Sequence, residues 1–171
     1  MVKKSAAEKA YELGKHYEKT YMGCSQCVLA ALQDVFNKRD DSVFKAATAL
    51  AGGGARTTQG SCGAYVGALL FLGSVFGRER DKFDDPEGVR MKTQALAIKL
   101  HDKFTQEYGS VVCANIQTKT MGRPYYLVDP EEFKKFHAAG AHEIHCPEVV
   151  GKSARWLTEI ILEAKQLPES E

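Results

Sequence analysis

Helical spacing of the apolar residues is the feature that most narrows what this chain can fold into. Two apolar faces repeat at intervals of three or four residues, Ala10, Leu13, Tyr17 and Tyr21 near one end and Val150, Ala154, Leu157, Ile161 and Ala164 near the other. No segment alternates convincingly as a strand would, and we interpret the strand-like stretch 122–128 as a loop. The pattern predicts an all-α fold, an irregular single-domain bundle of about six to eight helices over residues 1–171.

Capping residues, prolines and glycines set the expected helix boundaries between these two faces. The expected segments are Cys24 to about Phe36, Ser42 to about Ala51, Cys62 to Phe76, Pro86 to about Tyr108 and Pro130 to Ala138. The long fourth segment should turn Val89, Leu96, Leu100 and Phe104 inward. Residues 168–171 are expected to form a frayed tail.

Four of the five cysteines fall where a helix is expected to begin. They are Cys24, Cys62, Cys113 and Cys146. A helix N-terminus carries unpaired N–H groups and about half a positive charge, so it favours a thiolate over a thiol. Four such placements, spread over most of the chain, predict anionic sulfurs that folding brings to one shared site.

Four converging thiolates offer three kinds of chemistry. They form a ligand set for a metal ion, iron or zinc, or for an iron–sulfur cluster. They could instead serve a metal-free thiol–disulfide oxidoreductase, with Cys24 or Cys62 as the attacking catalytic residue and another cysteine resolving the mixed disulfide. The third alternative is a structural zinc site in an adaptor protein. The metal or iron–sulfur centre, serving electron transfer, is our first prediction, and the wide spacing of the four cysteines does not identify the metal.

Residues next to these cysteines are secondary candidates. Cys27 completes a CxxC with Cys24, and it faces either the core or the edge of the metal site. His145 precedes Cys146, and it is either a metal ligand, a proton carrier or an exposed loop histidine. Gly60 and Gly63 flank Cys62 and are candidate cofactor-binding residues, since bare backbone can donate N–H groups to anionic sulfur.

Charge and hydropathy exclude two classes of partner. The formal net charge is +1 and the signs are interleaved, so no nucleic acid is expected as a partner. The longest apolar stretch, 64–76, is shorter than the roughly 20 residues that span a bilayer, and no membrane association is expected. The N-terminus lacks the apolar core of a signal peptide. We therefore expect a cytoplasmic protein with reduced thiols.

The segment Cys62-Gly63-Ala64-Tyr65-Val66-Gly67 is a CGAxxG motif that lies between Cys24 upstream and Cys113 and Cys146 downstream. In this order of cysteines the chain resembles the redox-active protein family C_GCAxxG_C_C, over roughly residues 22–162. The resemblance implies redox activity, electron transfer to or from a redox protein partner, and an iron–sulfur or other metal centre on the cysteines. Cys27 and the long segment 118–142 depart from the family pattern. A homodimer is left open.

Overall fold

The computed structural model describes residues 5–166, and all regular secondary structure in this range is helical. It contains eight α-helices: α1 (Ala6–Tyr21), α2 (Cys24–Phe36), α3 (Asp41–Ala46), α4 (Gly63–Phe76), α5 (Val89–Tyr108), α6 (Cys113–Met121), α7 (Pro130–Ala138) and α8 (Cys146–Gln166). A five-residue π-helical turn, Ala141–His145, leads directly into α8. Within 5–166 there is no strand, only an isolated bridge between Ser61 and Val112. The all-α prediction is confirmed, while the tail expected at 168–171 lies outside the described residues.

Local capping explains where the predicted boundaries hold and where they fail. α7 begins where predicted, because the Asp129 carboxylate accepts hydrogen bonds from two amides of its first turn. α5 begins at Val89 and not at Pro86, because Asp85 caps Val89 from four residues away and Gly88 adopts a left-handed φ of 63°. The helix predicted over 42–51 is also wrong, since α3 ends at Ala46 and a short 3₁₀ turn, Thr48–Leu50, follows.

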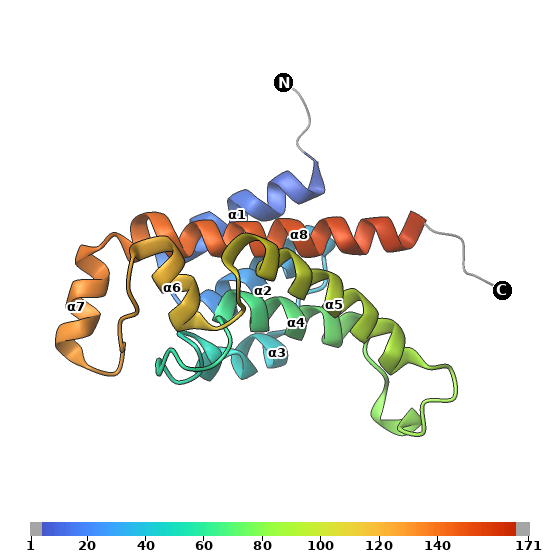
Figure 1. The fold of residues 1–171 in the computed structure, drawn as a ribbon. Coiled ribbons are helices and arrows are strands. Elements are labelled where there is room, and N and C mark those ends of the chain that lie inside the picture. Colours follow the sequence, from blue (N-terminus) through green and yellow to red (C-terminus); the bar gives the residue numbers. More distant parts are fainter. Residues whose placement is uncertain (1–4, 167–171) are drawn as a thin grey trace.

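α1 lies along α8, so the first and the last helix of the described chain are neighbours (Figure 1). Glycines permit this approach, because a Cβ on Gly14 would lie 3.2 Å from the Val150 carbonyl oxygen. The face of α1 that is buried consists of Ala10, Gly14 and Glu18. The predicted face was therefore partly wrong: Leu13 and Tyr17 are half-buried and Tyr21 is 69% exposed.

The apolar face predicted for α8 is buried as expected at Val150, Ala154, Leu157 and Ile161. On α5 the buried side chains are Leu100, Phe104 and Tyr108, whereas Val89 and Leu96 are half-buried. The main core thus lies between α1, α2, α4, α5 and α8. A second, smaller core of Tyr125, Leu127, Phe136 and Ala141 lies under α7, beside the first.

Helix α4 approaches α2 more closely than any side chain would allow. A Cβ on Gly67 would lie 2.1 Å from the Ser25 carbonyl oxygen, and one on Gly63 would lie 2.4 Å from the Cys24 sulfur. The small residues of the CGAxxG motif therefore bring the beginning of α2 against the beginning of α4.

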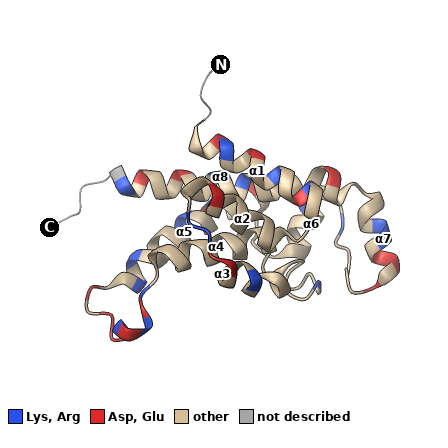
Figure 2. Cartoon of the chain, turned by 180° about the vertical axis from the view of Figure 1, so that it is seen from behind, with Lys and Arg blue, Asp and Glu red and all other residues tan. Residues whose placement is uncertain are grey.

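Charged side chains of both signs are interspersed along α1, α7 and α8, so none of these three helices carries a single sign (Figure 2). None of the helices in the described range combines the length and the apolar character needed to cross a bilayer.

Candidate functional site

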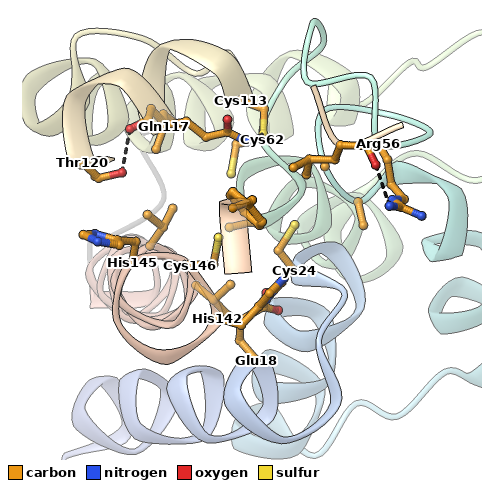
Figure 3. A pocket seen from close by; sticks show the side chains of 18 of the residues that line it. Glu18, Cys24, Arg56, Cys62, Cys113, Gln117, Thr120, His142, His145 and Cys146 are labelled. Atoms are coloured by element: carbon orange, nitrogen blue, oxygen red, sulfur yellow. Dashed lines mark hydrogen bonds and ion pairs between the residues drawn. The ribbon is translucent and has the colours of Figure 1, made fainter. Parts of the chain in front are cut away.

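A cavity of about 180 Å³ lies where α2, α4, α6 and α8 begin (Figure 3). Its wall contains four cysteines, one from each of these helix starts: Cys24, Cys62, Cys113 and Cys146. Much of the remaining wall is carbon, from Ile116, Leu127, Phe133, Phe136, Val149 and Val150. The structure therefore places the four predicted cysteines around one largely apolar space.

The loop between α3 and α4 fixes the positions of Cys62 and Cys113. Residues 52–56 all have left-handed φ values, between 48° and 78°, including the non-glycine Ala55 and Arg56. This unusual backbone folds the loop against the start of α6. The Cys62 amide donates to the Val111 carbonyl at 2.7 Å, and the Cys113 amide donates to the Gly60 carbonyl at 3.0 Å. The starts of α4 and α6 are thereby held side by side.

Cys24 and Cys62 are neighbours on the cavity wall. Cys24 is the first residue of α2, and Cys62 is the N-cap of α4. Because Gly63 has no side chain, the Cys24 sulfur can lie against the first turn of α4. There the neighbouring Cys62 thiol is near enough to raise the pKa of Cys24.

The thiols of Cys24, Cys113 and Cys146 have raised pKa values, which is opposite to the expectation from their helix-start positions. The neighbouring Cys62 thiol, burial and the charge of Glu18 raise the pKa of Cys24 well above its usual range, and the Gly52 backbone amide lowers it by less. Burial, followed by Glu18, raises the pKa of Cys146 in the same way. Burial raises the pKa of Cys113 to about 12. Desolvation of the charged form outweighs the helix dipole.

At Cys146 the helix-start argument fails for a second reason. The π-helical turn runs directly into α8, and the Cys146 amide donates to the Ala141 carbonyl. An N–H group that is already hydrogen-bonded cannot stabilise a thiolate. The prediction that all four cysteines would be held as thiolates is therefore wrong, although each stands where a helix begins.

The secondary candidates are placed differently from one another. His145 lines the cavity. Cys27 instead is buried in the main core, outside the cavity wall, and its thiol donates a hydrogen bond to the Met22 carbonyl oxygen at 3.3 Å. Burial and the nearby Glu18 raise the pKa of Cys27 far above its usual range. Gly60 and Gly63 are also outside the wall, and the Gly60 amide is engaged with the Gly53 carbonyl at 3.0 Å.

Five polar side chains of the wall were not identified from the sequence: Glu18, Arg56, Gln117, Thr120 and His142. Glu18 is 1% exposed, and its Oε1 lies 3.3 Å from Nδ1 of His142. Gln117 donates through Nε2 to the Cys113 sulfur at 3.6 Å and accepts the Tyr125 amide at 2.7 Å. The one sequence signal for Glu18 is its spacing of four residues from Gly14, on the face that small residues open to α8.

The donor set of the cavity suits a soft metal ion, since thiolates are the preferred ligands of zinc and of iron–sulfur clusters. Across residues 5–166, however, no group of three or more His, Cys, Asp or Glu side chains is arranged to hold a metal ion. The cysteines share a cavity, but they are not positioned as a preformed metal site.

One family model matches residues 22–160 of the chain, and its description is "Putative redox-active protein (C_GCAxxG_C_C)". No curated protein and no solved structure matches the chain. The matched range contains all four cavity cysteines and the CGAxxG segment that begins at Cys62. The match covers most of the sequence, and so the chain belongs to the C_GCAxxG_C_C family of putative redox-active proteins.

Proposed function

We propose that this protein is a thiol-based redox protein in which Cys24 and Cys62 interconvert between a dithiol and a disulfide. The observation that carries the proposal is the placement of these two thiols on one cavity wall, with the Cys24 sulfur against Gly63, the residue that follows Cys62. All five cysteines are free in the structure, so the described state corresponds to the reduced form. A reducing compartment such as the cytoplasm would keep the pair in that form.

The proposed reaction is a two-electron thiol–disulfide exchange with a redox protein partner. The thiolate of Cys62 attacks the partner's disulfide, one partner sulfur leaves as a thiol, and a mixed disulfide forms. The second cysteine then attacks its neighbour's sulfur, which releases the partner's other thiol. Two S–H bonds of this protein are replaced by one S–S bond, and the two electrons and two protons reduce the partner's disulfide to two thiols.

The cavity supplies what such a pair needs. The raised pKa of Cys24 keeps it protonated at neutral pH, which protects it from indiscriminate oxidation. The apolar wall excludes water from the sulfurs, and Gly63 lets them meet. The Gly52 amide favours the thiolate when the proton leaves.

Counting free thiols against an imposed redox potential tests the proposal. We expect two of the five thiols to be lost together in the wild type, and peptide mapping should identify the new disulfide as Cys24–Cys62. Cys24→Ser or Cys62→Ser should abolish the paired loss. Cys27→Ser is the matched control, because Cys27 is three residues from Cys24 but outside the cavity wall.

The proposal fails if all five thiols remain free at potentials that oxidise ordinary protein dithiols. It also fails if the disulfide that forms survives in Cys24→Ser. Either result can be read without a known partner, because small-molecule dithiol and disulfide buffers set the potential.

A metal or iron–sulfur centre on Cys24, Cys62, Cys113 and Cys146 is the second candidate, and the presence of four thiols from four separate segments at one cavity favours it. The sulfurs would have to move toward one another. Anaerobic purification, metal and sulfide analysis and a visible spectrum test this candidate. Cys113→Ser and Cys146→Ser separate the two readings, because they should remove a cluster and leave a Cys24–Cys62 disulfide intact. If zinc is found and chelation unfolds the protein without any redox response, a structural role replaces both.

A further inference from the structure

One oxygen of the buried Glu18 carboxylate has no hydrogen-bond partner among the described residues. Glu18 is only 1% exposed, and it lines the cavity. Its Oε1 is paired with Nδ1 of His142 at 3.3 Å, whereas its Oε2 accepts no hydrogen bond from any described residue. The nearby Cys27 thiol donates instead to the Met22 carbonyl. A buried carboxylate oxygen without a donor is costly, so this oxygen is available to a ligand that brings one.

The wall around Glu18 restricts what that ligand can be. The ring of Phe136 stands edge-on to the ring of His142, and their centroids are 5.3 Å apart. Val150, on α8, adds another apolar side chain to the same wall. Hard metal cations require about six or more oxygen ligands, which this wall does not offer. An apolar cavity of about 150 Å³ can hold a benzene ring, and this cavity is about 180 Å³.

We propose that the cavity binds a small organic cation, whose ammonium group donates to Glu18 Oε2 and whose ring-sized apolar body lies against Phe136. His142 holds the carboxylate in place through Oε1 and leaves Oε2 to the ligand (Figure 3). The bound molecule would occupy the space that the four thiols line. The proposal goes beyond the redox function and does not require the thiols to react.

Calorimetric titration of the reduced protein with benzylamine and with benzyl alcohol tests this. The two probes share a ring, but only the amine carries a positive charge at neutral pH. We expect saturable binding of benzylamine and affinity at least about tenfold weaker for the alcohol, the difference expected for one hydrogen bond to a charged group. Glu18→Gln should weaken benzylamine by a similar factor and leave the alcohol unchanged.

Glu143→Gln is the matched control, because Glu143 is exposed, adjacent to His142 and outside the cavity wall. It removes the same charge and should leave benzylamine binding unchanged. Equal affinity for amine and alcohol in the wild type, or no saturable binding of the amine, would overturn the proposal without any variant. Equal loss of amine binding in Glu143→Gln would overturn it too, since the effect would then be one of overall charge. None of these outcomes depends on whether Cys24 and Cys62 form a disulfide.

Discussion

Replacing Gly67 with Ala should be one of the most destabilising single-methyl additions in this protein. The new Cβ would lie 2.1 Å from the Ser25 carbonyl oxygen and 2.5 Å from a methyl group of Val28. Since Cβ atoms essentially never come nearer than 3.0 Å, α4 would have to withdraw from α2 by about 0.9 Å. The obstructing oxygen belongs to the backbone of α2, so no rotamer change can relieve the contact. Overpacking of this kind costs about 3 kcal/mol.

Gly73 provides the comparison within the same helix. A Cβ added there would meet nothing within 4 Å, and Ala has the higher helix propensity, so Gly73→Ala should stabilise by about 0.5–1 kcal/mol. Urea unfolding at fixed pH measures both, with the m-value as a check that both variants unfold in the same way. We expect the two variants to differ by about 4 kcal/mol. If their free energies of unfolding agreed within about 0.5 kcal/mol, the close approach of α2 and α4 would be refuted.

Two further predictions concern titration and capping. Because the pKa of Cys113 is raised from 9.0 to about 12 in the folded state, its contribution to stability is complete below pH 9 and is lost as pH rises toward 12. Between pH 8 and pH 10, urea unfolding should show a smaller decrease in the free energy of unfolding for Cys113→Ala than for the wild type. An equal decrease in both would contradict the burial of this thiol. Asp129→Ala removes the acceptor of the Glu131 and Glu132 amides and should cost about 1 kcal/mol, whereas Asp84→Ala, in a position that caps no helix, should be neutral by the same measurement.

The fold could be predicted from the sequence where local signals and burial agree. α2 and α7 have their predicted bounds because Gly23 and Asp129 define their starts unambiguously. The face of α1 was predicted less well, because periodicity selected the large residues Leu13 and Tyr17. Close packing of α8 against α1 requires small residues on that face of α1. Gly14 cannot be distinguished from a glycine that merely weakens the helix until α8 is known to lie against it.

The candidate site followed from the sequence in its cysteines but not in its electrostatics. Helix-start placement correctly located Cys24 and Cys113, but the sign of the pKa shifts was wrong. The helix dipole is a local property, whereas desolvation depends on how residues far apart in the sequence close around the sulfur. Glu18 was missed for the same reason, since its spacing of four residues from Gly14 indicates enclosure only once α8 is known to pack there.

The pairing of α1 with α8 has a consequence for the order in which the protein is made. Glu18 and Cys24 leave the ribosome long before Cys146, their neighbour across the cavity, has been translated. Until then the first helix lacks the surface against which it packs, and the early thiols lack the wall that encloses them. A nascent chain arrested after α6 should therefore react with a thiol-specific dye at Cys24 and Cys62, and release of the finished chain should protect both. The sulfurs are therefore enclosed only after α8 has been made, and no shorter nascent chain encloses them.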